Sequence, residues 1–160
     1  MIRDVEEKDA IGIASIYNYY VDKTWITFEQ EAVSSFVMAE RIRSTTENYP
    51  WMVFEEDGKI LGYIYADRWK SRAAYRYTVE STIYLDKDAG RKGIGRKLYT
   101  ELLPRLKEMG IKTVVVCIAI PNEASIGLHE KLGFRKVGIF TKVGYKFETW
   151  IDVGFWELVF

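Results

Sequence analysis

A chain of 160 residues is long enough to bury a sizeable core, and its length predicts one domain covering residues 1–160. With 48% hydrophobic residues, 29% charged residues and three prolines, the composition excludes intrinsically disordered and collagen-like proteins. Lys plus Arg and Asp plus Glu both number 23, so no net charge draws the chain toward nucleic acid or an anionic membrane, and we expect neither as a partner.

The cysteine count and the apolar runs predict a cytoplasmic protein. A lone cysteine, Cys117, excludes an internal disulfide framework. The first ten residues carry acids and lack the apolar segment of a secretory signal. The longest apolar run, residues 114–120, is far shorter than the about 20 residues that cross a bilayer.

The first 50 residues predict a short strand and two helices. Residues 2–5 have strand character, and Asp9 can cap the helix that follows. The apolar positions of this helix are Ile13, Ile16, Tyr17 and Tyr20. Residues 24–32 predict a loop, and residues 33–43 predict a second helix. Its apolar side carries Phe36, Val37 and Ile42.

The middle of the chain predicts a hairpin, a long strand and a helix. Residues 51–54 and 60–66 are strand-like and flank the turn dipeptide Asp57-Gly58. Residues 75–85 are rich in β-branched and aromatic side chains, which favours a long strand. A Gly-rich loop then leads into a helix, which Pro104 should kink. The apolar stripe of this helix is Leu98, Leu102, Leu106 and Met109.

The last third predicts a buried strand at residues 114–120, a short helix at residues 123–132 and strands near residues 134–143 and 149–160. Strand, Gly-rich loop, helix and strand form a βαβ unit with a parallel strand pair. The expected fold class is therefore α/β, with a central mixed sheet of six to seven strands flanked by about four helices.

The loop at residues 90–97 is the strongest candidate for a ligand site. Its three glycines allow close approach of the backbone to an anion, and the first amides of the following helix have no internal partner. A Walker A loop does not fit, because Arg96 stands where that motif has Lys. A dinucleotide-binding fingerprint that begins at Gly93 does not fit either, because Leu98 stands where its third glycine belongs. A phosphate or pyrophosphate is the expected guest; a solvated basic loop with a helix cap is the alternative.

Six further stretches make the chain resemble the GNAT N-acetyltransferases, and more closely their phosphinothricin acetyltransferase group. They are IYNYYV, TFEQE, GYIYADRW, AYRYTVESTIYL, PNEASIGLHEKLGF and WIDVGFW, in the family's order between residues 16 and 156. Gly90 departs from the pattern, because the family loop often begins with Gln or Arg and Arg91 comes one place later. The resemblance implies a GNAT-type acyltransferase fold whose sheet splays at the acetyl-CoA slot, a homodimer, and an amino-acid-like small-molecule amine as acceptor.

No metal is expected, because one His and one Cys give no set of companion ligands. The resemblance also implies where acetyl-CoA binds. Backbone groups of Ile83, Tyr84 and Leu85 would meet the pantetheine arm. The pyrophosphate would lie on Arg91, Lys92, Gly93, Ile94, Gly95 and Arg96. Asn122 matches a CoA-contacting asparagine, and Lys131 occupies a position that can reach the far end of the cofactor.

Acetyl transfer needs a base, because an ammonium has no lone pair for attack on the thioester. Glu80 is the first candidate: strand alternation places it with Thr78, Thr82 and Tyr84, and the resembled group assigns the base role to this glutamate. An exposed glutamate paired with Arg76 is the alternative.

His129, the single histidine, occupies a position where many family members have a catalytic tyrosine. It could act as acid, base or donor, or be structural.

The acceptor pocket is expected at two segments. The resembled group places substrate contacts at the turn before the catalytic strand, here Ala73, Ala74 and Tyr75, where Arg72 or Arg76 could pair with a carboxylate. Phe28 and Glu29 look like a loop that enters this pocket, from the same or a second subunit. Cys117 lies in an apolar strand and is expected to be inert packing.

Other interpretations stay open. The acceptor could be a peptide N-terminus, an aminoglycoside or a polyamine. A non-catalytic CoA-sensing module and a phosphate-binding scaffold without CoA are further alternatives, and the scaffold predicts no slot beside residues 83–85.

Overall fold

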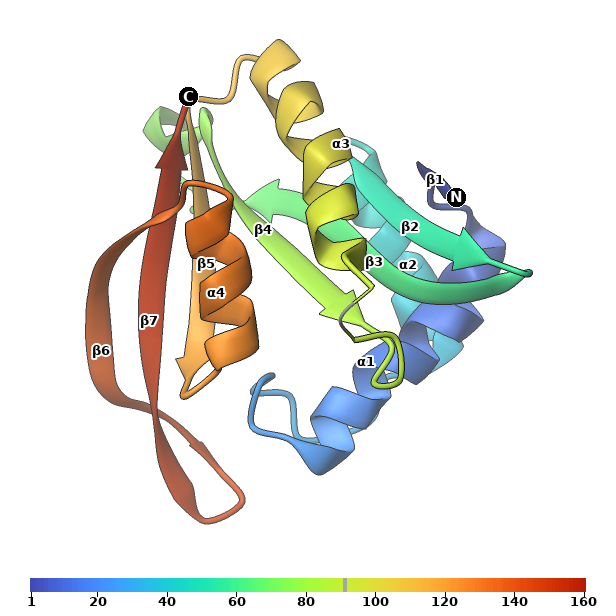
Figure 1. Cartoon of the computed structure of the whole chain (residues 1–160), viewed down its shortest axis with the longest axis horizontal. Coiled ribbons are helices and arrows are strands. Elements are labelled where there is room, and N and C mark those ends of the chain that lie inside the picture. The colour runs from blue at the N-terminus through green and yellow to red at the C-terminus, as the bar shows by residue number, and fades with distance from the viewer. Residues whose placement is uncertain (91) are drawn as a thin grey trace.

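The structure, a computed structural model, describes residues 1–90 and 92–160, and their strands form one seven-stranded mixed sheet (Figure 1). Its order is β1-β2-β3-β4-β5-β7-β6. The strands are β1 Ile2–Asp4, β2 Trp51–Glu56, β3 Lys59–Arg68, β4 Thr78–Leu85, β5 Thr113–Ile120, β6 Arg135–Lys146 and β7 Thr149–Val159. The helices are α1 Ala10–Lys23, α2 Ser35–Thr46, α3 Ile94–Glu108 and α4 Glu123–Lys131, with 3-10 turns η1 Glu7–Asp9 and η2 Ala73–Tyr75. This confirms the predicted α/β class.

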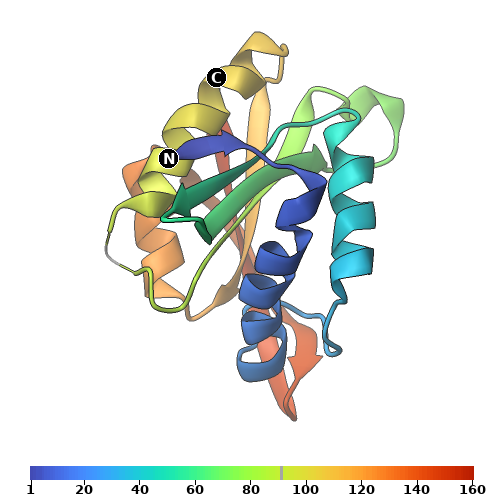
Figure 2. The same cartoon turned by 90° about the vertical axis from the view of Figure 1, so that its right-hand side faces the viewer.

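The helices cover both faces of the sheet. Figure 2 shows α1 and α2 on one face and α3 and α4 on the other. Each pair of helices seals its own buried cluster: Leu98, Leu102 and Leu106 of α3 are fully buried against one face, and Ile13 of α1 is fully buried against the other. The leucine stripe predicted from helical spacing is thus confirmed, except that Met109 follows the end of α3 and is half exposed.

The sheet opens between its two parallel central strands. β4 and β5 pair only at their first residues, from Thr78 opposite Thr113 to Glu80 opposite Val115. Beyond that point β4 continues to Leu85 and stays paired with β3, while β5 continues to Ile120 and stays paired with β7. The neighbouring edges of the two strands therefore part, which confirms the predicted splay.

Three local predictions are corrected. The second helix begins at Ser35, after Ser34 accepts a hydrogen bond from the Val37 amide at 3.1 Å, and in this register Phe36 is exposed. Asp9 precedes α1 but does not cap it, because its carboxylate accepts from the Glu6 amide and pairs with Arg3. The long strand begins at Thr78, since η2 occupies the start of the segment predicted as strand.

The β2–β3 turn behaves as its residue types require. Asp57 and Gly58 both have positive φ, 50° and 76°, and close the β2–β3 hairpin as predicted. The helix α3 runs without interruption through Pro104. In the described residues, no helix is both long and apolar enough to span a membrane.

Candidate active site

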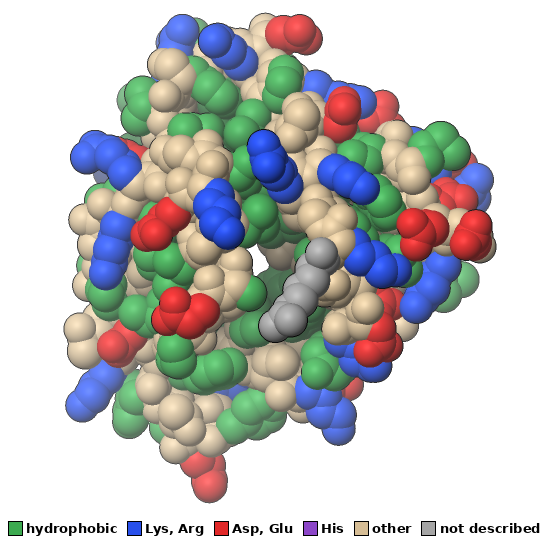
Figure 3. Space-filling model, viewed as in Figure 1, with side chains coloured by type: hydrophobic (Ala, Val, Ile, Leu, Met, Phe, Trp, Pro, Cys, Tyr) green, Lys and Arg blue, Asp and Glu red, His purple; other side chains and the backbone are tan. Residues whose placement is uncertain are grey.

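A slot of about 390 Å³ lies where β4 and β5 part. Its walls carry residues from both faces of the sheet, because the gap passes between the strands: Glu80 and Tyr84 face the α1 side, whereas Ser81 and Ile83 face α3 and α4. Figure 3 shows a hollow in the middle of the face that carries α3 and α4, with Lys and Arg side chains around it. Predicted residues that line the slot are Glu80, Ile83, Tyr84, Leu85, Asn122 and His129.

Glu80 sits at the point where the two strands separate. Burial raises the pKa of its carboxyl above the ordinary value; a hydrogen bond from the Cys117 thiol opposes this, and the Asp67 carboxylate raises the pKa further. Asp67 lies directly opposite Glu80 in the β3–β4 pairing. A carboxylate with a raised pKa beside an open slot has the properties of a general base.

Cys117 is not packed inside the sheet, which corrects the sequence expectation. It lies on the stretch of β5 that has parted from β4, so its side chain is exposed in the slot beside Glu80. Although part of the side chain is exposed, the slot walls shield the thiol from water and raise its pKa to about 12, and the Glu80 carboxylate raises it as well. The thiol is therefore protonated at neutral pH and a poor nucleophile, as predicted.

His129 belongs to a buried hydrogen-bond chain that links α4, α3 and β4. Its Nδ1 lies 2.7 Å from the Ser125 carbonyl oxygen, which can only accept, so Nδ1 carries the proton. Nε2, at 2.8 Å from the Tyr99 hydroxyl, must then accept, and Tyr99 in turn accepts from the Ser81 hydroxyl at 2.9 Å. Burial lowers the pKa of His129, so the ring is neutral at pH 7 and both ring nitrogens are engaged.

The Gly-rich loop meets the slot through α3. Gly93, with φ of 70°, precedes the helix, and Ile94 and Gly95 are buried in its first turn. A Cβ on Gly95 would lie 2.9 Å from Leu128 and 3.5 Å from Ile83, which both line the slot. An added Cβ at Gly95 would therefore require the Leu128 side chain to shift, and of the described loop residues it is Gly90 that lines the slot itself.

The other residues predicted to contact acetyl-CoA divide between the slot and the surface. Asn122 caps α4 by accepting from the Ser125 amide at 3.2 Å, and it lines the slot. The Leu85 carbonyl already accepts from the Tyr20 hydroxyl at 2.6 Å, which leaves it less available to a ligand. Lys92, Arg96 and Lys131 are exposed, and Lys92 lies 3.6 Å from Glu56. Arg91 lies outside the described residues.

The predicted acceptor loop packs against its own chain. The ring of Phe28 covers Gly144 of β6, where a Cβ would lie 2.3 Å away. Lys146, also in β6, is buried and donates to the Thr27 carbonyl at 2.9 Å. Glu29 pairs with Arg41 of α2 at 2.6 Å. Loop 24–34 is therefore fixed between α2 and the β6–β7 hairpin.

The predicted acceptor turn is not brought into the slot. Arg72 and Tyr75, with Lys70 and Ser71, line a separate shallow depression, and Ala73 and Ala74 are exposed in η2. Arg76 lies over the Tyr77 ring and donates to the Ala73 carbonyl rather than pairing with Glu80. The segment between β3 and β4 instead carries several cations, which come just before β4 and therefore N-terminal to Glu80.

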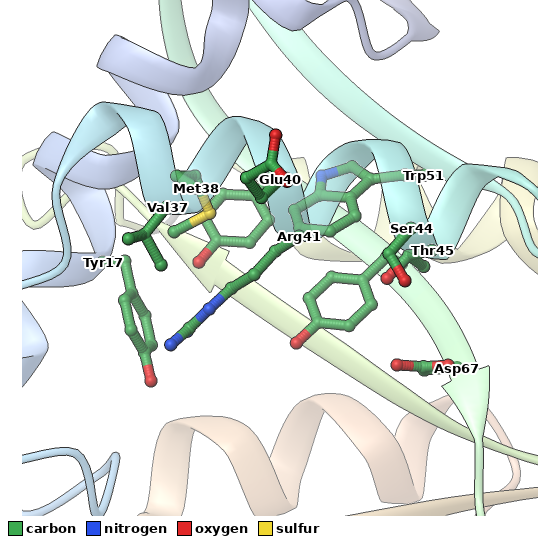
Figure 4. Close-up of a pocket in the computed structure, with 11 residues that line it drawn as sticks. Tyr17, Val37, Met38, Glu40, Arg41, Ser44, Thr45, Trp51 and Asp67 are labelled. Atoms are coloured by element: carbon green, nitrogen blue, oxygen red, sulfur yellow. The ribbon is translucent and has the colours of Figure 1, made fainter.

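A second cavity, the α2 pocket, lies between α2 and β3 and was not predicted (Figure 4). Its volume is about 450 Å³. It is lined by Tyr17, Val37, Met38, Glu40, Arg41, Ser44, Thr45, Trp51, Tyr63, Tyr65 and Asp67. Asp67 of β3 lies directly opposite Glu80 of β4. Because Asp67 lines the α2 pocket and Glu80 lines the slot, the two cavities adjoin at this pair of carboxylates.

Comparison with known proteins agrees with this geometry. The family described as "Acetyltransferase (GNAT) domain" matches residues 2–154. The phosphinothricin N-acetyltransferase of Streptomyces viridochromogenes is 38% identical over 98% of this chain and 85% of its own length. The L-methionine sulfoximine/L-methionine sulfone acetyltransferase of Salmonella typhimurium is 34% identical over 98% of this chain and 92% of its own length.

A solved structure gives the same result. The phosphinothricin acetyltransferase from Sinorhizobium meliloti in complex with AcCoA superposes with a TM-score of 0.95 and is 35% identical, covering 99% of this chain and 87% of that one. The chain therefore belongs to the GNAT acetyltransferase family, as its motifs predicted, and is an acetyl-CoA-dependent N-acetyltransferase. In residues 1–90 and 92–160, no cluster of three or more His, Cys, Asp or Glu side chains could hold a metal ion.

Proposed function

We propose that the slot between β4 and β5 holds acetyl-CoA and that Glu80 is the base that prepares the acceptor amine. The observation that carries this proposal is the parting of the strands at Glu80: beyond it, alternate peptide groups of β4 have no β5 partner and are available to a ligand. That all strands lie in one sheet supports treating residues 1–160 as a single domain.

The residues around the slot have distinct roles in this proposal. Acetyl-CoA supplies the thioester whose carbonyl carbon the amine attacks, so the C–N bond forms as the C–S bond breaks. CoA leaves as its thiolate and takes up the proton that the nitrogen releases on becoming the amide. Glu80 takes up the proton that the amine must lose, and its raised pKa suits that task near neutral pH. The amides of residues 93–96 and the N-terminus of α3 bind the diphosphate.

In this proposal His129 supports the structure of the slot and does not itself donate a proton to the substrate. Its Nδ1 proton is given to Ser125 and its Nε2 lone pair is occupied by Tyr99, so neither atom is free to exchange a proton with substrate in this arrangement. The chain from Ser81 through Tyr99 to His129 joins β4 to α4, the two walls of the slot. It thereby fixes the width of the slot.

We propose a small amino-acid-like amine as the acceptor, of the phosphinothricin or methionine sulfone and sulfoximine type. The names of the relatives support this class. A phosphate scaffold without CoA does not fit, because the slot lies beside residues 83–85.

The test is thiol release from acetyl-CoA with a panel of amines. We expect release with methionine sulfone, methionine sulfoximine and phosphinothricin. A peptide N-terminus, an aminoglycoside and spermidine should give release near background. Release with one of these three and with no amino-acid analogue would overturn the proposed acceptor while leaving the acetyltransferase activity in place.

We further propose a homodimer formed by the β6–β7 hairpin. β6 is the edge strand of the sheet. It and the hairpin expose a run of large apolar side chains: Val137, Ile139, Phe140, Val143, Tyr145, Phe147 and Trp150. Sedimentation equilibrium should give a dimer, and Val143→Asp should give a monomer, because a buried unpaired charge is costly. Phe36→Asp, on α2 at a site more exposed than Val143, should stay dimeric.

The cytoplasm stays the predicted location. A free thiol such as Cys117 persists in a reducing compartment, which is consistent with this prediction.

A further inference from the structure

Two carboxylates face each other across strands β3 and β4. Asp67 lies directly opposite Glu80 in the antiparallel pairing, so both side chains stand on the same face of the sheet. The Cβ atoms of two residues in this relation are typically about 4.5–5.5 Å apart. The Asp67 carboxylate accepts a hydrogen bond from the Arg68 amide at 2.7 Å, which restricts its movement. The register of the sheet therefore makes the two acidic groups neighbours.

No cation compensates these two carboxylates. Among the described residues, neither Asp67 nor Glu80 takes part in an ion pair. Arg41 shares the α2 pocket with Asp67, but it pairs with Glu29 at 2.6 Å and lies toward Tyr17, at the other end of the pocket (Figure 4). Like charges placed directly opposite each other destabilise a sheet. This arrangement beside the proposed base therefore indicates a role in the reaction rather than in stability.

The other titratable groups beside Glu80 do not supply a charge. Cys117 of β5 and Tyr65 of β3 both have a pKa that burial raises to about 12, and the histidine of α4 is neutral at pH 7. Lys70, between β3 and β4, acts on the Cys117 thiol rather than on the Glu80 carboxyl. The further titratable side chains that line the slot are Tyr20, Tyr84, Asp86 and Lys87. Among the described residues, Asp67 is thus the charged group whose field acts on Glu80.

The two carboxylates lie in different surroundings. Glu80 is half-buried and lines the slot, whereas Asp67 is exposed and lines the α2 pocket. Burial raises the pKa of Glu80, while solvent stabilises the negative charge of Asp67. Where surroundings separate two neighbouring carboxyls in this way, the two groups can take different roles in one reaction.

On the basis of the function proposed above, in which Glu80 is the base, we propose that Asp67 is a positioning residue that sets the pH range of the reaction. Its negative charge strengthens the hold of Glu80 on the proton that the acceptor's ammonium gives up. The second proton of the amine goes to the CoA thiolate, so Glu80 returns its own proton to water before the next turnover. Asp67 takes no part in the bond changes and acts only through the charge state of Glu80.

Asp67→Asn tests this role, because the amide keeps the shape of the side chain and can still accept from the Arg68 amide. We would measure kcat/KM against pH with acetyl-CoA saturating, using methionine sulfone or whichever amine of the panel gives the fastest release. The acidic limb should move to lower pH by roughly half a unit, the size typical of a charge pair with an exposed member. The acceptor's own titration is the same for every variant, so the shift belongs to the enzyme.

Two control variants separate charge from shape. Asp67→Glu keeps the negative charge and should leave the acidic limb near its wild-type position. Asp57→Asn removes the same charge from the hairpin turn before β3, at the opposite end of that strand from Asp67, and should leave the limb in place. A limb that moves equally in Asp67→Asn and Asp57→Asn would reflect net charge alone and would overturn the assignment of Asp67.

Salt dependence of the wild type gives a readout that needs no variant to fold. Because Asp67 is exposed, dissolved ions screen its field at Glu80. Between about 0.01 M and about 1 M salt, the wild-type limb should move to lower pH, and this movement should be smaller in Asp67→Asn. Equal movement in both proteins would contradict the proposed action of Asp67.

Urea unfolding separates this role from a structural one. Since Asp67→Asn removes a repulsion between facing charges, it should unfold at a higher urea concentration than the wild type at neutral pH. A residue that only held the strands together would give the opposite result.

Failure of this inference and failure of the proposed function give different results. If Glu80→Gln keeps the wild-type rate and pH profile, Glu80 is not the base and the proposed function fails. If Glu80→Gln abolishes the acidic limb while Asp67→Asn leaves it in place, Glu80 remains the base and the role of Asp67 alone fails.

Discussion

Replacing Glu80 by Gln should lower kcat by about 10²- to 10⁴-fold, the range that general base catalysis contributes. The amide has the shape of the carboxylate but accepts no proton from an ammonium. At Glu80, strand β4 pairs with β3 along one edge and with β5 along the other. The substitution therefore leaves the backbone of the slot in place. The Kd for acetyl-CoA should therefore stay near the wild-type value, which isothermal titration calorimetry can measure beside the rate.

The pH profile gives a second readout of the same prediction. Burial raises the pKa of Glu80, so the wild-type rate should fall as pH drops through this raised value and the carboxylate takes up a proton. In Glu80→Gln the limb that belongs to this group should be absent. An unchanged kcat in Glu80→Gln would mean that another group is the base.

Cys117→Ser is the matched control, because Cys117 lies in the slot beside Glu80. With a thiol pKa of about 12, Cys117 is not a thiolate at neutral pH, and a hydroxyl can still donate to Glu80. Its kcat should stay within the same order of magnitude. A loss as large as that of Glu80→Gln would favour a route through acetyl-cysteine.

Local patterns in the sequence predicted the parts of the site that depend on one element. Strand alternation placed Glu80 on the face away from Val79, and the structure has it there, with Val79 in the α3 cluster. Glycine and proline marked the hairpin turn and the start of α4. Each of these follows from the geometry of a single strand, turn or helix.

Features that depend on how elements meet could not be predicted in this way. An apolar run indicated burial for Cys117, but β5 loses β4 as its neighbour beyond Val115 and the side chain faces the slot. Ser81, Tyr99 and His129 lie on three elements, and nothing local to any of them indicates their hydrogen bonds. The predicted cofactor contacts came from the family resemblance.

The α2 pocket shows the same limit. Nothing in the sequence distinguishes Arg41 from an ordinary surface arginine or Trp51 from an ordinary core tryptophan. The pocket that both residues line exists only once α2 packs over β2 and β3. Asp67 meets Glu80 only because the segment that includes η2 returns the chain in a register that pairs these two residues. A sequence signal for this contact would have required correct pairing of β3 with β4.

Replacing Gly95 by Val should weaken acetyl-CoA binding about tenfold, because overpacking a tight site typically costs about 1–3 kcal/mol. An added Cβ would meet the Leu128 side chain at 2.9 Å and Ile83 at 3.5 Å, and the two branches of valine extend further. Both neighbours line the slot, so relief of the clash moves a slot wall. The first turn of α3, whose amides are proposed to bind the diphosphate, would shift with it.

The control is Gly127→Ala in α4, where an added Cβ meets nothing within 4 Å. Alanine is favoured over glycine in a helix by about 0.5–1 kcal/mol, so this variant should unfold at a higher urea concentration and bind acetyl-CoA as the wild type does. Calorimetric titration of both variants with acetyl-CoA separates the two effects. Wild-type affinity in Gly95→Val, or a crystal soaked in acetyl-CoA with the nucleotide bound away from residues 93–96, would contradict the assignment of this loop, because the diphosphate would then not depend on the first turn of α3.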